Sequence, residues 1–172
     1  FNQVPISQRS QSGLNGWVGH PAWKTLRGKL INDGTYRNVE PILAPYDTAE
    51  LADYAVEARI RVNRVGGYYG NSFGLWGRRT TDGGGYRGGV RLDESAAVGN
   101  DRVWLAGGVN YRPDGEWHTY RLELDGNVTT FLVDGAQLAT VTDNIQLTGG
   151  LTGLFSDGYQ LEVESFRVLR LR

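Results

Sequence analysis

The segment Trp117–Val141 reads WHTYRLELDGNVTTFLVDGAQLATV, and its pattern predicts the class of the fold. Ring-bearing or aliphatic side chains alternate with polar ones from His118 to Leu124, which is the period of a strand with one buried face. Asp-Gly pairs at 125–126 and 134–135 then bracket a second apolar strand. Because an Asp-Gly pair accepts the positive φ angles of tight hairpin turns, the segment predicts three consecutive antiparallel strands.

Length and composition limit the kinds of protein that the chain can be. Its 172 residues suffice for one well-buried domain and hardly for two. Hydrophobic residues make up 40% and charged residues 22%, a balance typical of globular proteins. The net charge of −1 argues against nucleic acid or an anionic membrane as the partner. No run approaches the roughly 18 apolar residues of a membrane span, so we expect no membrane insertion by this chain.

Strand patterns continue outside the opening segment, whereas no helical stripe of comparable strength occurs. The clearest alternation runs from Tyr54 to Val62. Residues 24–32 predict one strand, 40–46 a short edge strand limited by its two prolines, and 161–171 a last strand with a bulge near Ser165. Roughly a dozen short strands with frequent turn signals predict an all-β fold, a two-sheet antiparallel β-sandwich.

One face of each predicted strand supplies the core between the two sheets. The side chains that we expect inside are those of Tyr54, Val56, Ile60, Val62, Phe73, Leu75, Tyr120, Leu122, Leu124, Phe131, Val133, Leu151, Leu161, Val163 and Phe166.

The N-terminal segment differs from the rest of the chain. Residues 1–22 are polar and irregular and are broken by five glycines and prolines, so they predict an arm attached to a sandwich domain of residues 23–172. Three roles stay open for the arm. It covers its own sheet with Trp17 as the anchor, it tethers the domain to a membrane or a larger protein, or it mediates self-association by docking on a neighbouring copy.

Aromatic and arginine side chains gather between residues 66 and 112. If 73–79, 86–92 and 102–108 are neighbouring strands, their alternation separates two sets of side chains. The set expected in the core is Phe73, Leu75, Val90, Leu92, Val103 and Leu105. The set expected on the outer face, with tyrosines at its two ends, is Tyr69, Trp76, Arg78, Arg87, Arg91, Trp104 and Tyr111.

This outer-face set predicts a binding site for an oligo- or polysaccharide. The C–H face of a sugar ring stacks on an indole, and arginine pairs with vicinal hydroxyls or with a uronate carboxylate. In the alternative interpretation the two tryptophans form a cross-strand pair under the N-terminal arm, and the arginines form ion pairs at the rim. A further location for the ligand is the loop edge formed by residues 82–85 and 93–101.

The motif of the opening segment resembles a known superfamily. A Trp-His opening, a strand, a short turn and a strand that ends in Val133-Asp134-Gly135 are similar to the penultimate meander of concanavalin A-like jelly rolls. These include laminin G modules, legume-type lectins, carbohydrate-binding modules and laminarinase-type hydrolases. The chain also resembles the domain attached to 3-keto-disaccharide hydrolases, through residues 23–34, 53–62, 117–135 and 150–168. The resemblance implies a jelly-roll sandwich that binds carbohydrate outside the cell or at its surface.

The sequence gives little support to catalysis. His20 and His118 lie far apart, and His118 is in phase with the core, which favours a hydrogen-bonded core or rim histidine over a general base. Laminarinase-type members of the superfamily carry a Glu-x-Asp-x-x-Glu strand, and no such motif occurs here. We therefore expect a protein that is not an enzyme and needs no cofactor.

A structural calcium ion is the one metal that the resemblance implies. In laminarinase-type sandwiches a carboxylate before the final Val-Arg-Val helps to hold it, and Glu164 occupies the matching position here. Glutamate is one methylene longer than aspartate, and a hard cation needs six or more oxygen ligands. The alternative is that Glu164 forms an ion pair with a nearby arginine.

Three functions stay open at this stage. The first is non-catalytic binding of a glycan by a secreted or surface-displayed domain. The second is a structural or adhesive subunit that docks through residues 1–22. The third is a glycoside hydrolase or lyase whose pair of carboxylates does not match a recognised motif.

Overall fold

The computed structural model describes residues 16–19, 22–34, 41–64 and 72–171. The strands of these residues are β1 (Trp23–Leu26), β2 (Lys29–Asn32), β3 (Ile42–Leu43), β4 (Tyr54–Arg64), β5 (Ser72–Arg79), β6 (Tyr86–Val90), β7 (Ser95–Gly99), β8 (Trp104–Asn110), β9 (Trp117–Asp125), β10 (Val128–Val133), β11 (Ala136–Thr142), β12 (Leu151–Asp157) and β13 (Gln160–Arg170). No described segment forms a helix that is long and apolar enough to cross a membrane.

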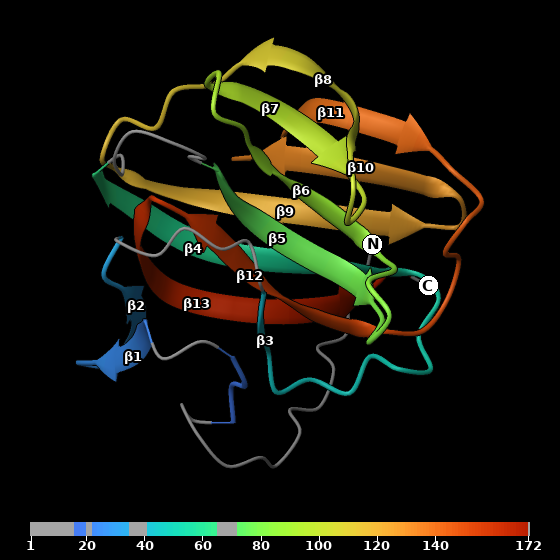
Figure 1. The fold of residues 1–172 in the computed structure, drawn as a ribbon, viewed down its shortest axis with the longest axis horizontal. Helices are drawn as coiled ribbons and strands as arrows, with labels where there is room; N and C mark the ends of the chain where they lie inside the picture. Colours follow the sequence, from blue (N-terminus) through green and yellow to red (C-terminus); the bar gives the residue numbers. More distant parts are fainter. Residues whose placement is uncertain (1–15, 20–21, 35–40, 65–71, 172) are drawn as a thin grey trace.

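The strands form two antiparallel sheets that lie face to face (Figure 1). The first sheet has seven strands in the order β1-β2-β13-β4-β9-β10-β11. The second has six strands in the order β3-β12-β5-β6-β7-β8. The predicted two-sheet antiparallel sandwich is therefore confirmed. The three-strand meander of the opening segment is present as β9, β10 and β11, with consecutive strands paired.

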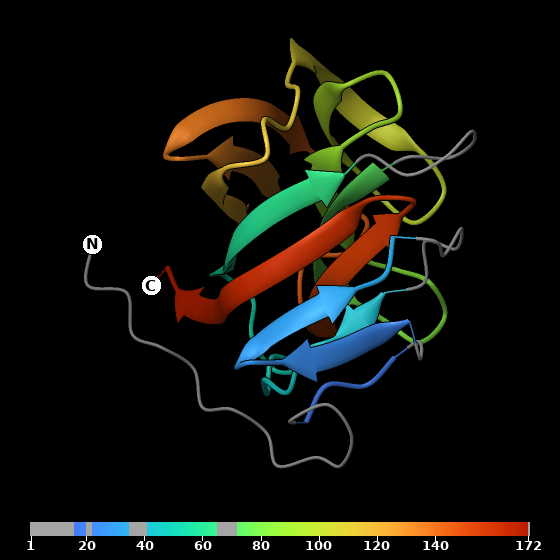
Figure 2. The ribbon, with the colours of Figure 1, turned by 90° about the vertical axis from the view of Figure 1, so that its left-hand side faces the viewer.

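Two details of the predicted strands are confirmed, and one is wrong. β3 is an edge strand, as its flanking prolines indicate. β13 contains a bulge, because its pairing with β4 shifts register between Val163 and Ser165. The predicted single strand 24–32 is instead the hairpin of β1 and β2, which lies beside β13 (Figure 2). Its turn residues Arg27 and Gly28 have φ angles of 51° and 76°, so an Arg-Gly pair makes the primed turn that Asp-Gly usually makes.

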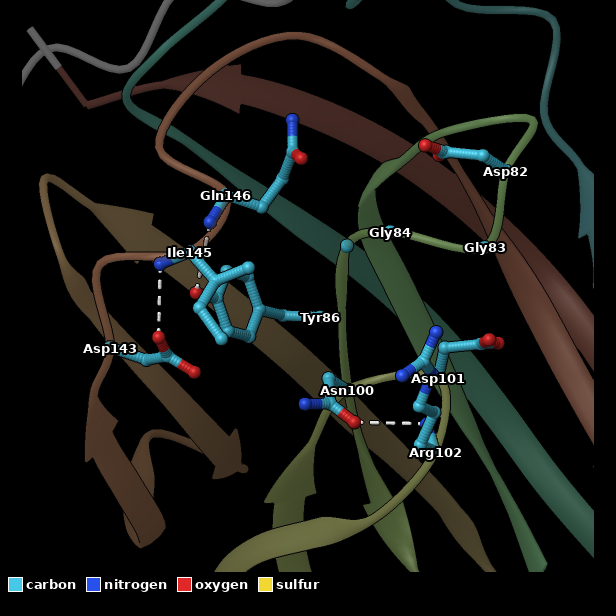
Figure 3. A pocket seen from close by; sticks show the side chains of 11 residues that line it. Asp82, Gly83, Gly84, Tyr86, Asn100, Asp101, Arg102, Asp143, Ile145 and Gln146 are labelled. Carbon is cyan, nitrogen blue, oxygen red and sulfur yellow. Dashed lines mark hydrogen bonds between the residues drawn. The ribbon is translucent and has the colours of Figure 1, made fainter.

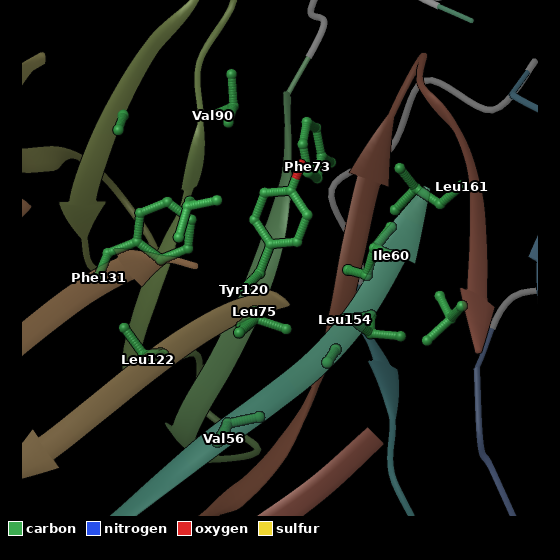
Figure 4. Close-up of a cluster of buried hydrophobic side chains, with 14 of the residues drawn as sticks. Val56, Ile60, Phe73, Leu75, Val90, Tyr120, Leu122, Phe131, Leu154 and Leu161 are labelled. Carbon is green, nitrogen blue, oxygen red and sulfur yellow. The ribbon is translucent and has the colours of Figure 1, made fainter. Parts of the chain in front are cut away.

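The core lies between the sheets and consists of the inward side chains of the alternating strands (Figure 4). Of the fifteen side chains from Tyr54 to Phe166 that we expect between the two sheets, all are buried except Leu151 and Phe166, which are half-buried. Leu151 is the first residue of β12, at the end of its sheet. Phe166 packs against the edge of Trp17, with ring centroids 4.9 Å apart, so the described end of the N-terminal segment covers it.

Arg78 departs from the predicted pattern, because its side chain points into the end of the sandwich and not outward. Leu151 pairs with Arg79 and Gly153 with Trp76, so two residues of β5 face the single residue Thr152. This bulge gives Arg78 a φ of 50° and turns its side chain inward, where it is fully buried. The prediction that Arg78 lies on the outer face is therefore wrong.

The buried guanidinium of Arg78 joins three loops. It donates to the carbonyl of Ala52 from Nε and Nη2, at 3.2 and 2.7 Å. Its Nη1 donates to the carbonyls of Gly126 and Gln146, at 2.9 and 3.1 Å. Burial lowers the pKa of Arg78, but the carboxylate of Asp53 lies 3.8 Å from Nη2 and compensates the charge. The arginine thus holds together the end of the sandwich at which these loops meet.

At the opposite end of β9, His118 links the strand to the residues that precede β9 and follow β10. Its Nδ1 lies 2.6 Å from the carboxylate of Asp134, and its Nε2 lies 2.8 Å from that of Asp114. Burial lowers the pKa of the ring, but the two carboxylates outweigh this effect and hold the pKa above its ordinary value. His118 is thus a hydrogen-bonded histidine at the rim of the sheet, as its phase in the strand predicts.

Truncation of the fully buried Ile60 tests the packing of the core. We expect Ile60→Ala to lower the free energy of unfolding by about 2 to 5 kcal/mol, because the lost methyl and methylene groups leave a cavity. Urea unfolding followed by tryptophan fluorescence measures this change. The control is Lys24→Ala on the exposed face of β1, which should leave stability unchanged. A loss below about 0.5 kcal/mol at Ile60 would contradict the packing.

Replacement of Arg78 tests its role at the end of the sandwich. We expect Arg78→Met to cost about 3 to 5 kcal/mol, because it removes the donor to three loop carbonyls and the cation beside the carboxylate of Asp53. The control is Arg170→Met, since Arg170 lies exposed at the end of β13. Equal stability of the two variants in urea unfolding would show that the contacts of Arg78 do not stabilise the fold.

The His118 contacts predict a pH dependence. A raised pKa in the folded state means that the contribution of His118 is fully present below the unfolded pKa of about 6.5 and is lost as pH rises through the folded pKa. The free energy of unfolding of the wild type should therefore exceed that of His118→Gln by more at about pH 6 than at about pH 9. Urea unfolding at both pH values measures this difference. The same difference at both values would contradict the assignment.

Candidate functional site

Three loops form a pocket at the end of the sandwich that Arg78 holds together (Figure 3). The loops connect β5 to β6, β7 to β8 and β11 to β12, and the pocket has a volume of about 320 Å³. Its lining residues are Asp82, Gly83, Gly84, Gly85, Tyr86, Asn100, Asp101, Arg102, Asp143, Ile145 and Gln146. The loop edge considered from the sequence as a further location for the ligand thus contributes two of its three walls.

The β5–β6 loop presents an ionised carboxylate. The hydroxyl of Thr80 donates to Asp82 Oδ1 and accepts from the backbone N–H of Gly84 at 2.7 Å. The hydroxyl of Thr80 and the N–H of Gly84 hold the pKa of Asp82 below its ordinary value. A Cβ on Gly84 would lie 2.5 Å from Thr80 Oγ1 and 3.2 Å from Gln146 Oε1, so a larger residue there would displace the Thr80 hydroxyl that holds Asp82. The loop therefore lies close against the opposite wall.

The β7–β8 loop presents an amide and a second carboxylate. Asn100 Oδ1 accepts from the backbone N–H groups of Arg102 and Val103, at 2.9 and 3.0 Å. The amide nitrogen of Asn100 therefore points away from this turn, as Figure 3 shows. Asp101 Oδ1 accepts from Arg79 Nη1 at 2.6 Å. These internal contacts fix both side chains before any ligand arrives.

The third wall combines polar and aliphatic groups. Asp143 Oδ1 accepts from the N–H of Ile145 at 3.0 Å, and the hydroxyl of Tyr86 accepts from the N–H of Gln146 at 3.4 Å. The side chain of Ile145 is 81% exposed. An exposed aliphatic group beside several fixed hydrogen-bonding groups suits a small ligand with many hydroxyl groups and an apolar face.

An aromatic cluster lies on the outer face of the six-stranded sheet, next to the pocket. Trp76 pairs with Arg87, Arg87 with Gly99, and Gly99 with Trp104, so Trp76, Arg87 and Trp104 share one face as predicted. The Arg87 guanidinium stacks over Trp104 at 4.1 Å and lies 5.9 Å from Trp76. The ring of Phe155 completes the cluster, with its centroid 5.8 Å from the guanidinium of Arg87. The sequence analysis did not include Phe155, because β12 lies far along the chain from β5, β6 and β8.

The two tryptophans of this cluster differ in exposure. Trp76 is 2% exposed and lies under the guanidinium of Arg79 at 4.5 Å, so the prediction that it is an open stacking platform is wrong. Trp104 is half-buried and keeps part of its ring at the surface. The cluster therefore offers one accessible ring, and the cation of Arg87 lies against it.

The remaining predicted ligand residues do not join the cluster. Arg91 lies in the β6–β7 turn, about 13 Å along the chain from Arg87, and bonds to Asp93 and Ser95. Tyr111 packs against the core, and its hydroxyl shares a hydrogen bond of 3.0 Å with that of Tyr120. Tyr69 lies outside the described residues.

Three side chains expected in the core are exposed. They are Leu92, Val103 and Leu105, with exposed fractions of 61%, 52% and 38%. Leu92 lies in the β6–β7 turn, and Val103 precedes β8. Ala106 pairs with Val98 and Trp104 with Gly99, so Leu105 is the extra residue of a bulge in an edge strand. The alternation on which the prediction depends is interrupted there.

Glu164 is the extra residue of the β13 bulge and pairs with Arg59 at 2.8 Å. This is the ion pair that the sequence analysis gave as its alternative role. Among the described residues, no group of three His, Cys, Asp or Glu side chains could hold a metal ion. Calcium at Glu164 would compete with the cation of Arg59 and would need backbone oxygens as ligands, so it stays a prediction.

The neighbouring Glu162 does not support acid catalysis. It forms ion pairs with Lys29 and Arg61, both at 2.8 Å. The hydrogen bonds from these two cations hold its pKa at about 2. Glu162 is therefore ionised at neutral pH and has no proton to donate.

Comparisons with known proteins give no match to a family model and none to a curated sequence. Solved structures match over almost the whole chain. The carbohydrate-binding module CBM66 from Bacillus subtilis matches with a TM-score of 0.63 and 14% identity, over 98% of this chain and 97% of that one. The exoplasmic/lumenal domain of VIP36, in its Ca²⁺/Man3GlcNAc-bound form, matches with a TM-score of 0.73 and 12% identity, over 99% and 88%.

A GH43 protein from Bacillus licheniformis, BlXynB, also matches, with a TM-score of 0.66 and 11% identity. The match covers 94% of this chain but only 38% of that protein. At such identities the matches establish the fold alone. The chain has the fold of the concanavalin A-like lectin and glucanase superfamily.

Proposed function

We propose that this protein binds a carbohydrate in the loop-end pocket, with Asp82, Asn100 and Asp101 as the hydrogen-bonding groups and Ile145 as the apolar contact. The observation that carries the proposal is the fixed position of these groups before a ligand is present. Asp82 is held by Thr80, Asn100 by its own turn and Asp101 by Arg79. Preorganised hydrogen-bonding groups lose little side-chain entropy when a ligand binds, which lowers the free-energy cost of binding.

The neighbouring aromatic cluster extends this site. Arg87 follows Tyr86 in the chain and pairs with Gly99, the residue before Asn100, so the cluster and the pocket are contiguous. Trp104 offers the ring on which a second sugar residue would stack. Of the residues proposed from the sequence, Trp104 and Arg87 keep a direct role in binding. Trp76 supports them from below.

The comparisons support this function at the level of the fold. CBM66 is described as a carbohydrate-binding module, and VIP36 was solved with Man3GlcNAc. A secreted, surface-displayed or lumenal location fits neighbours such as the exoplasmic/lumenal domain of VIP36. The match to the GH43 protein BlXynB covers 38% of that protein, and at 11% identity it supports the fold and no activity. We infer a non-catalytic role.

Removal of a single pocket charge tests the proposal. We expect Asp82→Asn and Asp101→Asn each to weaken glycan binding by about 10-fold to 100-fold, because a hydrogen bond to a charged group contributes roughly 1.5 to 3 kcal/mol. A glycan array selects the ligand, and isothermal titration measures its affinity for each variant.

The matched control is Asp47→Asn, since Asp47 is exposed and outside the pocket. Its affinity should equal that of the wild type. The proposal fails if the array yields no binding, or if both pocket variants bind as the wild type does.

A further inference from the structure

Arg87 is a buried cation without an acceptor in the part of the chain that the structure describes. Its side chain belongs to a residue that is 7% exposed, and no hydrogen bond or ion pair joins it to any described residue. The other buried or half-buried arginines of the two sheets are different. Arg78 donates to carbonyls, Arg79 bonds to Asp101, and Arg121 pairs with Glu57.

Contacts with the rings do not compensate the charge of Arg87. A guanidinium gains less from cation–π contacts than it loses when it leaves water. Burial lowers the pKa of Arg87, which reflects this loss, and the nearby cation of Arg79 lowers it further. The negative charge of Asp101 raises the pKa of Arg87 without bonding to it. The Oδ1 atom of Asp101 already accepts a hydrogen bond from Arg79.

Two unpartnered donors occur in the same cluster. Arg87 Nε and Trp76 Nε1 are both buried and have no hydrogen-bond partner among the residues that the structure describes. The two Nη groups of Arg87 are not among the buried atoms without a partner, so they reach solvent. Trp104 is half-buried and lies against the same guanidinium at 4.1 Å. The guanidinium of Arg87 therefore stacks on Trp104 and directs its two Nη groups toward solvent, where a ligand can accept hydrogen bonds from them.

We propose that Arg87 binds an oxyanion on a sugar ring that stacks on Trp104, so that the glycan recognised by this protein is acidic. This inference rests on the proposed function. Arginine binds carboxylate and sulfate groups through two parallel hydrogen bonds, and the two solvent-facing Nη groups of Arg87 are the donors that an oxyanion from outside can reach. The pocket itself carries the carboxylates of Asp82, Asp101 and Asp143, so it suits an uncharged sugar residue next to the acidic one.

Matched acidic and neutral glycans test the inference. The probes are trigalacturonate and its methyl ester for the carboxylate, and a sulfated galactan oligosaccharide and its desulfated form for the sulfate. For one of the two pairs we expect the acidic member to bind the wild type at least about tenfold more tightly. Arg87→Met should remove this preference, whereas the exposed control Arg170→Met should keep it.

Two further measurements guard against misfolding of the variant. Arg87→Lys keeps the charge but loses the planar fork, so it should keep part of the preference. In the wild type, the NMR signals of Arg87 Nε–H and Trp76 Nε1–H should shift with the acidic member of the pair and not with the neutral one.

The outcomes separate the two proposals. If both members of each pair bind equally and their binding depends on Asp82, the pocket binds glycan but the inference about Arg87 is wrong. A preference that survives Arg87→Met, or that leaves the two NMR signals unmoved, also overturns it. If the glycan array and all four probes show no binding, the function and the inference fail together.

Discussion

The packing of two sheets through one alternating set of side chains is the constraint on which this structure depends. β4, β9 and β13 pair along most of their lengths and direct their apolar residues at β5, β6 and β12. Because apolar side chains fill the space between the sheets, the groups that can contact a ligand lie in the loops and on the outer faces of the sheets. The pocket and the aromatic cluster occur in these two places, which separates the stability of the sandwich from the chemistry of the site.

Bulges interrupt the alternation of two strands and so determine which of their side chains point into the core. The bulge in β5 turns Arg78 inward, and the bulge in β8 leaves Leu105 at the surface. Each bulge adds one residue and so reverses the faces of the residues that follow it. Arg78 would otherwise share the outer face with Arg87. Instead its guanidinium joins loop carbonyls, including that of Gln146 in the pocket wall.

Features that depend on local sequence signals could be predicted, whereas features that depend on contacts between distant segments could not. The meander of β9 to β11 could be predicted, because alternation and Asp-Gly turns are local signals. The shared face of Trp76, Arg87 and Trp104 could be predicted for the same reason. The burial of Trp76 could not, because it depends on Arg79 lying over the ring. Phe155 could not be placed either, since its strand joins the sheet from a distant part of the chain.

The pairing of Arg79 with Asp101 explains why Arg87 has no acceptor among the described residues. Asp101 is the carboxylate that raises the pKa of Arg87, and Arg79 already binds it. Arg79 also stacks on Trp76, so two guanidinium groups lie on one ring while a single carboxylate faces them. One positive charge is therefore left uncompensated at the junction of the pocket and the cluster. Rotation of Arg79 away from Trp76 would free Asp101 for Arg87 but would uncover the buried ring. The burial of Trp76 thus favours the arrangement that leaves the donors of Arg87 open to a ligand.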